Sequence, residues 1–218
     1  MEFINISDTN LNANIDKQGL KKLIILPDHS PGRGKLPVGS VAVYSKKEHT
    51  PYSELLGPDI GCGMLLAKFK SKVRNLEDSV NGIAEKIISK NKGFGSLGGG
   101  NHFINFYKVK DSNISPIIAP SDQTVLIHSG SRDKGNNIYK EKLSGEDYIR
   151  KQSEILEYSK NNRKKLLEII QECCENSAQI VLDKTHNYIE QTESDIIYRK
   201  GAVKINKGDE NGGEIMSH

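Results

Sequence analysis

The sequence has no tryptophan and only three cysteines among its 218 residues. Cys62, Cys173 and Cys174 are too few for a disulfide framework, so we expect free thiols in a reducing compartment. Long apolar runs are missing as well, because a run such as residues 23–26 is far shorter than the roughly 20 residues of a membrane-spanning helix. The first ten residues show neither the basic nor the apolar segment of a secretory signal. We therefore expect a cytoplasmic protein with no membrane partner.

The chain carries little net charge. Its 31 basic and 28 acidic residues give a formal charge of +3. This value is too small to indicate nucleic acid by itself, although a local cluster such as residues 163–165 can meet phosphates. With 35% hydrophobic residues the length suits a globular core. We predict a single domain over residues 1–218.

Short apolar runs alternate with glycine-rich turns, which predicts an α+β fold with mixed β-sheets and flanking helices. The expected strands cover residues 23–26, 40–44, 64–69, 102–107 and 124–128. The expected helices cover residues 76–90 and 145 to about 180, with a break at residues 161–162. Residues 46–57 are predicted to form an exposed loop, and the tail from residue 207 is predicted to be loose.

Residues 93–98 match the pattern GxGxxG, but their context argues against a dinucleotide site. That fingerprint needs a strand before it and a helix after it. Here a predicted helix precedes the glycines and a predicted strand follows them. We therefore reject a dinucleotide-binding fold.

Metal-ligand residue types fall where predicted strands meet glycine- or serine-rich turns, and loops at strand ends commonly carry functional sites. These residues are Asp59, Cys62, His102 and His128, and His186 lies beside Asn187 after a predicted helix. Together they offer donors for one or two divalent ions. A thiolate with imidazoles favours zinc, whereas carboxylate and water suit manganese or magnesium, so residue chemistry leaves the metal open. A purely structural role for each histidine is the alternative.

The glycine-rich turns indicate a second role. Backbone N–H groups of residues 98–100 and 129–131 can cradle phosphate oxygens, and Arg132 can add a bidentate contact. The alternative is that these glycines only permit tight turns. Cys173 and Cys174 lie on a helical apolar stripe and are expected to be buried. We expect the remaining histidines to be solvated, namely His29, His49 and His218.

Taken together, five motifs resemble, in order, the motif series of the RtcB RNA ligases. They are Pro58-Asp59-Ile60-Gly61-Cys62-Gly63-Met64, Gly95 to Ile104 (GSLGGGNHFI), His128-Ser129-Gly130-Ser131-Arg132, His186-Asn187 and Arg199-Lys200-Gly201-Ala202. Residues 27–32 and the pair Asn162-Arg163 also fit the pattern, so the resemblance covers about residues 25–205. The first motif is similar to that of the release-factor-coupled subgroup.

The resemblance implies an RNA ligase that uses GTP and two Mn²⁺ ions in RNA repair or tRNA splicing. Such enzymes join an RNA 3′-phosphate or 2′,3′-cyclic phosphate end to a 5′-hydroxyl end. By motif position the metal ligands would be Asp59, Cys62, His102, His128 and His186. The residues that bind nucleotide or phosphate would be Asn101, Ser129, Arg132, Asn187 and Lys200.

The sequence also departs from the family pattern. The motif that carries the family's nucleophilic histidine, which resembles Ser-Cys-x-His-Gly-Ala-Gly-Arg, does not follow Ala202, so the catalytic residue is unknown. We expect the C-terminal guanylylation part to be absent or to be supplied in trans by a complementary fragment, and by family analogy an activating protein is a further expected partner. Asn105 stands where the family usually has glutamate, and Ser30 where histidine is usual. Two alternatives stay open: a non-catalytic or split-enzyme module that binds metal and RNA ends, and a metal-dependent phosphoesterase.

Overall fold

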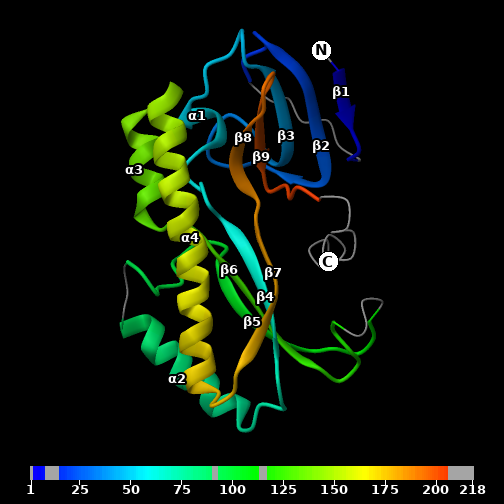
Figure 1. Cartoon of the computed structure of the whole chain (residues 1–218), viewed down its shortest axis with the longest axis vertical. Coiled ribbons are helices and arrows are strands. Elements are labelled where there is room, and N and C mark those ends of the chain that lie inside the picture. The colour runs from blue at the N-terminus through cyan, green and yellow to red at the C-terminus, as the bar shows by residue number, and fades with distance from the viewer. Residues whose placement is uncertain (1, 8–14, 90–92, 113–116, 206–218) are drawn as a thin grey trace. The chain divides into compact units, whose positions relative to one another are not determined.

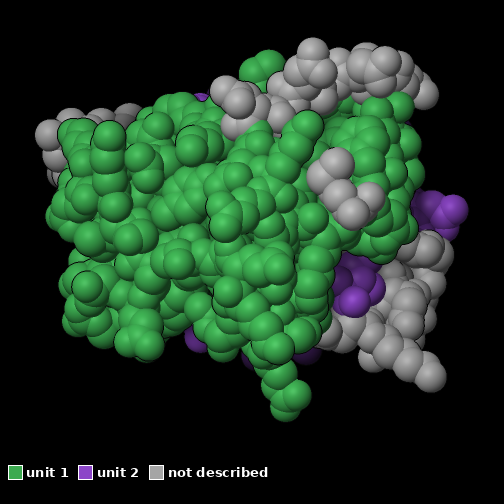
Figure 2. Space-filling view, turned by 90° about the horizontal axis from the view of Figure 1, so that it is seen from above, with its two compact units in different colours: residues 1–62, 133–158, 185–204 green, residues 63–132, 159–184, 205–218 purple. Residues whose placement is uncertain are grey.

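The computed structural model describes residues 2–7, 15–89, 93–112 and 117–205 (Figure 1). The described part of the chain contains helices and two β-sheets, which confirms the expected α+β class. The chain divides into two compact units, coloured separately in Figure 2. Unit 1 comprises residues 1–62, 133–158 and 185–204, and unit 2 comprises residues 63–132, 159–184 and 205–218. The expectation of one domain over residues 1–218 stays a prediction.

Unit 1 is built on a five-stranded sheet with the order β1-β2-β3-β9-β8. Its strands are β1 (Glu2–Asn5), β2 (Leu20–Ser30), β3 (Val38–Ser45), β8 (Asn187–Gln191) and β9 (Asp195–Lys200). β1 pairs with β2 in parallel, and the other pairings are antiparallel, so the sheet is mixed. Its helices are α1 (Ser53–Leu56), α3 (Asp133–Glu141) and the first half of α4 (Gly145–Cys173).

The core of unit 1 forms where helix residues meet the sheet. Ile138 of α3 and Tyr148 and Ile155 of α4 are buried in one cluster with sheet residues such as Ile25 and Tyr198. Removing this much apolar surface from water is the main stabilising contribution in such a layer.

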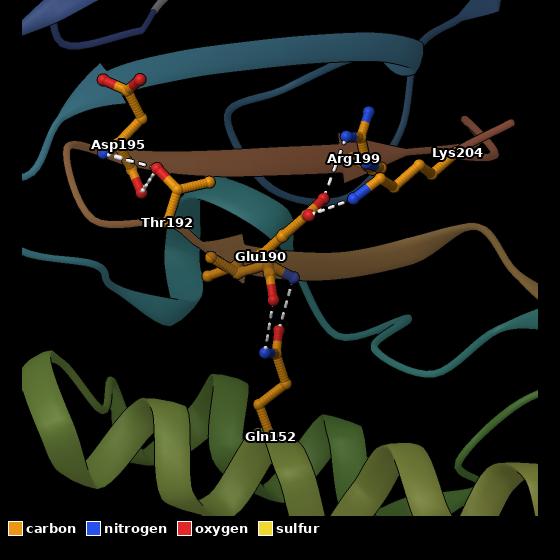
Figure 3. A network of polar contacts seen from close by, with 7 residues as sticks. Gln152, Glu190, Thr192, Asp195, Arg199 and Lys204 are labelled. Atoms are coloured by element: carbon orange, nitrogen blue, oxygen red, sulfur yellow. Dashed lines mark hydrogen bonds and ion pairs between the residues drawn. The ribbon is translucent and has the colours of Figure 1, made fainter. Parts of the chain in front are cut away.

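A polar contact joins α4 to the sheet of unit 1 (Figure 3). The Gln152 side chain accepts a hydrogen bond from the Ile189 N–H at 2.7 Å and donates one to the Ile189 carbonyl at 3.0 Å. The Glu190 carboxylate on β8 accepts from Arg199 of β9 and from Lys204, which follows β9. These contacts fix the strand that begins directly after His186.

Unit 2 contains a four-stranded sheet with the order β5-β6-β4-β7. Its strands are β4 (Gly63–Phe69), β5 (Phe103–Lys108), β6 (Gln123–Ser129) and β7 (Ala178–Thr185), of which Thr185 falls in unit 1. Helix α2 (Leu76–Ser89) and the second half of α4 cover one face of the sheet. Ile83, Leu166 and Ile170 are buried there in one cluster with Leu65 and Ile127.

Five predicted elements are confirmed, with boundary shifts of one or two residues: β3, β4, β5, β6 and α2. Two other predictions need correction in unit 1. The strand predicted at residues 23–26 continues through Pro27 to Ser30, because a register shift after Ile25 interrupts the pairing that proline cannot make. Residues 46–57 are not a purely exposed loop, since α1 buries Leu55 and Leu56.

The prediction of a break at residues 161–162 is wrong. Helix α4 runs unbroken from Gly145 to Cys173, and Asn162 is fully buried within it. The helix ends at Cys173, so Ile180 belongs to β7. The predicted tail from residue 207, with His218, lies outside the described residues. Among the helices in the described part of the chain, none combines the length and apolar character needed to cross a membrane.

Candidate functional site

Unit 1 contributes two short segments that hydrogen bonds tie together. The Cys62 N–H donates to the Asp59 carbonyl at 3.2 Å, which closes the turn before β4. The His186 N–H donates to the Cys62 carbonyl at 2.9 Å. Cys62 is 4% exposed, whereas the Asp59 carboxylate is partly exposed and accepts a 2.8 Å contact from Arg33. A thiol and an imidazole are therefore held on neighbouring backbone segments, with a carboxylate three residues away.

Asn187 holds this arrangement together. Its side-chain amide donates to the Asp59 carbonyl at 3.0 Å and accepts from the Gly201 N–H at 2.7 Å. Its own backbone carbonyl accepts from Gly61 at 2.9 Å. Because the polar atoms of this buried amide are engaged with backbone, Asn187 acts on the shape of the loop.

Lys200 is a buried cation at the end of β9. Its ammonium donates to the carbonyls of Arg33 and Leu36, the latter at 2.7 Å. Burial lowers the pKa of Lys200 to about 8, and the positive charge of Arg33 acts in the same direction while Asp59 opposes it. Lys200 thus anchors the loop that carries Arg33.

In unit 2, His128 is the last residue but one of strand β6, and its surroundings suit a metal ligand. Its Nδ1 lies 2.9 Å from the Asn101 carbonyl. A carbonyl can only accept, so Nδ1 carries the proton in the neutral ring and Nε2 carries the lone pair. Burial lowers the pKa of His128, which favours this neutral form, and the Asn101 hydrogen bond partly opposes the shift. A carbonyl partner on the far nitrogen is typical of metal-bound histidine.

His102 lies beside His128 in unit 2. Their ring centroids are 5.3 Å apart in an edge-to-face arrangement, and Phe103 contacts His128 in the same way. The antiparallel register of β5 and β6 pairs Phe103 with His128, which explains why the preceding His102 is adjacent.

Arg132 is seated in the glycine-rich loop of unit 2. Its Nε donates to the Ser96 hydroxyl at 3.0 Å and its Nη1 to the Leu97 carbonyl at 3.2 Å. Its backbone adopts a φ of 60°, in the left-handed region that non-glycine residues rarely occupy. The guanidinium fills the space that a side chain at Gly98 would need.

Asn162 and Arg163 of α4 support these loops. The Asn162 amide accepts from the Gly95 N–H at 2.7 Å and donates to the Ser96 carbonyl and the Ser129 hydroxyl. Arg163 forms a buried 2.7 Å ion pair with Asp183 and donates to the Ser129 carbonyl. The suggestion that residues 163–165 form a cluster for phosphates therefore fails at Arg163.

The predicted site residues are divided between the two units. Asp59, Cys62, His186, Asn187 and Lys200 lie in unit 1, and Asn101, His102, His128, Ser129 and Arg132 lie in unit 2. Cys62, His128 and His186 each offer one ligand atom suited to a metal ion. The donor chemistry, with a buried thiol and an imidazole of defined tautomer, fits a divalent cation.

For two histidines the environment predicted from the sequence is wrong, and for one serine no role was predicted. His49 is buried, not solvated: it stacks on Tyr44 and its Nε2 lies 2.9 Å from the Tyr198 hydroxyl. His29 is half-buried. No role was expected for Ser96, whose position inside the glycine-rich segment was the available signal. Cys174 is buried as expected, whereas Cys173, which was also expected to be buried, is only half-buried.

Known proteins match this chain in two ways. A family model described as tRNA-splicing ligase RtcB matches residues 87–144, the segment that carries the glycine-rich loop, His128 and Arg132. The RNA-splicing ligase RtcB2 of Escherichia coli is 27% identical over 250 aligned residues, which cover 95% of this chain. The chain spans 64% of the length of that relative. The resemblance predicted from the motifs is confirmed: the chain is similar to the RtcB ligases.

Proposed function

We propose that this chain is the metal- and end-binding part of an RNA ligase. The ligase joins a 3′-phosphate or 2′,3′-cyclic phosphate RNA end to a 5′-hydroxyl end with GTP and Mn²⁺, in cytoplasmic RNA repair or tRNA splicing. The observation that carries the proposal is the 2.9 Å contact between His128 Nδ1 and the Asn101 carbonyl, which assigns the proton of the neutral ring to Nδ1 and makes Nε2 the metal-binding atom in this proposal. The likeness to the RtcB ligases supports the reaction class.

In this proposal two Mn²⁺ ions are held by Asp59, Cys62 and His186 of unit 1 and by His102 and His128 of unit 2. Bound divalent ions would neutralise the charge that develops on a transferring phosphoryl group. The protein's own contribution is to present the donors in their binding form. The Asn101 carbonyl fixes the His128 tautomer. The hydrogen bond from the His186 N–H to the Cys62 carbonyl keeps these two candidate ligand residues adjacent.

Asn101 and Arg132 are proposed to contact the phosphates of the nucleotide or of the RNA end. Arg132 is half-buried, and the Asn101 side chain is exposed. Ser129, Asn187 and Lys200 were assigned to the same group, but their buried contacts favour a supporting role through the loops they hold. We propose that a complementary C-terminal fragment supplies the nucleophile for the guanylyl group, and that an activating protein is a further partner.

A titration of Mn²⁺ by calorimetry tests the metal proposal on this chain. We expect binding by the wild type, a loss of at least about tenfold in affinity for Cys62→Ala and for His128→Ala, and no loss for Cys174→Ala. Cys174→Ala is the matched control because it removes a buried thiol of the apolar core of unit 2. Equal affinities in all four proteins would overturn the ligand assignment.

A ligation assay tests the reaction. A 3′-phosphate RNA and a 5′-hydroxyl RNA are incubated with GTP and Mn²⁺, with this chain alone and with the corresponding C-terminal segment of the Escherichia coli relative added. Joining that requires both polypeptides supports the proposal. Joining in neither condition removes the catalytic claim, and release of inorganic phosphate instead would identify a phosphoesterase.

A non-catalytic module that binds RNA ends is the second candidate. It is favoured by Arg132, which the free chain already holds in place with two hydrogen bonds. This candidate predicts tighter binding of 3′-phosphate RNA than of 3′-hydroxyl RNA, without joining in either ligation condition. Equal affinity for the two RNAs would exclude it.

A further inference from the structure

The glycine-rich loop of unit 2 was expected to cradle phosphate through its own N–H groups, but the structure shows that an arginine side chain occupies part of it. Arg132 reaches back into residues 96–98, where the Ser96 hydroxyl and the Leu97 carbonyl accept its N–H groups. Gly98 has a φ of +93°, and a methyl group there would overlap the guanidinium. The lack of a side chain at this position is therefore what makes room for Arg132.

Asn162 of α4 binds the loop segment that contacts Arg132. Asn162 is fully buried, and its amide accepts from Gly95 at 2.7 Å and donates to the Ser96 carbonyl at 3.1 Å. Ser96 also donates its hydroxyl to the Gly93 carbonyl at 2.6 Å, which leaves the hydroxyl lone pairs directed at Arg132. The Gly95 N–H and the Ser96 carbonyl are thus both bound by the Asn162 side chain.

We propose that Gly98 and Asn162 are positioning residues for Arg132. Gly98 provides the seat for the guanidinium, and Asn162, through Ser96, holds the loop in the shape that seats it. The role of the seated guanidinium toward an RNA phosphate rests on the proposed function, whereas the seating itself does not. A guanidinium held before binding loses less conformational entropy when it meets a phosphate, which increases affinity.

The loop offers a matched control for Gly98. Gly100 has a similar φ of +81°, but a side chain there would meet nothing within 4 Å. Gly98→Ala and Gly100→Ala therefore impose comparable backbone strain, and only the first competes with Arg132 for space. Asn161→Ala is the control for Asn162→Ala, because Asn161 is the exposed neighbour on the same helix.

The first readout is the exchange of the Arg132 Nε–H proton with water, measured by arginine ¹⁵N NMR and assigned with Arg132→Lys. Loss of one hydrogen bond to a charged donor corresponds to about tenfold faster exchange or more. We expect this acceleration in Gly98→Ala and Asn162→Ala and not in Gly100→Ala or Asn161→Ala. Circular dichroism verifies that each variant is folded. Should Asn162→Ala fail to fold, Gly98→Ala decides, because its change lies in a loop outside the core.

The second readout is the ratio of affinities for two short RNAs that differ only in a 3′-phosphate or 3′-hydroxyl end, measured by fluorescence anisotropy. In the wild type we expect a preference for the phosphate that Arg132→Ala abolishes, that Gly98→Ala reduces about tenfold, and that Asn161→Ala retains. Equal proton exchange in Gly98→Ala and Gly100→Ala would overturn the positioning. If the wild type bound both RNAs equally, the proposed phosphate role would be overturned. The exchange rate of the Arg132 Nε–H proton would still test whether Gly98 and Asn162 position Arg132.

Discussion

Replacing Arg163 by alanine is expected to destabilise the chain more than any surface substitution. The Arg163 and Asp183 side chains are 1% and 8% exposed, and their charged atoms are 2.7 Å apart. The substitution leaves the Asp183 carboxylate buried without its countercharge and removes a donor from the Ser129 carbonyl. The Asp183 carboxylate and the Ser129 carbonyl lost their hydrogen bonds to water when the chain folded, and the substitution does not restore them.

The expected magnitude follows from this geometry. Removing one partner of a buried ion pair costs about 3–5 kcal/mol of unfolding free energy. That is a large part of the total of about 5–15 kcal/mol that is usual for a folded domain. Replacing both partners, as in Arg163→Met with Asp183→Leu, should cost much less, because apolar side chains of similar size need no countercharge.

Urea unfolding followed by circular dichroism measures these differences. Lys164→Ala is the control, since Lys164 is exposed on the same helix and should change the unfolding free energy by no more than about 0.5 kcal/mol. If Arg163→Ala cost less than about 1 kcal/mol, the pair would behave like an exposed one, and burial would not account for its contribution to stability.

Three further outcomes are expected. Asn187→Ala should lower the unfolding free energy by about 1–3 kcal/mol in urea titrations, because it leaves the Gly201 N–H without its acceptor and removes the side-chain donor that the Asp59 carbonyl has beside the Cys62 N–H. Burial lowers the pKa of His49 below its ordinary 6.5, with Asp16 opposing, so the unfolded chain takes up protons first and the urea midpoint should fall as the pH drops below about 6.5; His49→Gln should flatten this slope. The Lys200 ammonium should titrate near pH 8 in lysine ¹⁵N NMR, and a value near 10.5 would show that it is not buried.

Strands β2 to β6 were predictable, because runs such as Gln123–Ser129 combine β-branched residues with flanking turns, whereas β1, β7, β8 and β9 were not predicted. What failed depended on distant contacts. Asn162 was interpreted as a helix break from its low helix propensity, but its partners, Gly95 and Ser129, lie 67 and 33 residues away along the chain. His49 looked solvated in a polar segment until Tyr44 and Tyr198 enclosed it.

The same limit applies to the candidate site. The motifs placed His128 at a strand end, and the structure agrees. Its tautomer could not be predicted, because that depends on the Asn101 carbonyl 27 residues earlier. The seat of Arg132 was equally hidden, since a glycine in a sequence does not reveal whether it permits a turn or leaves room for another residue.

The contact between Gln152 and Ile189 has a consequence for how this chain behaves at high concentration. β8 is the last strand of its sheet, and an open strand edge is a template onto which another chain can pair. By binding both the N–H and the carbonyl of Ile189, the Gln152 amide occupies hydrogen-bonding positions that an incoming strand would use. One side chain of a helix thus acts as a short stretch of neighbouring strand and protects the sheet from aggregation at this point.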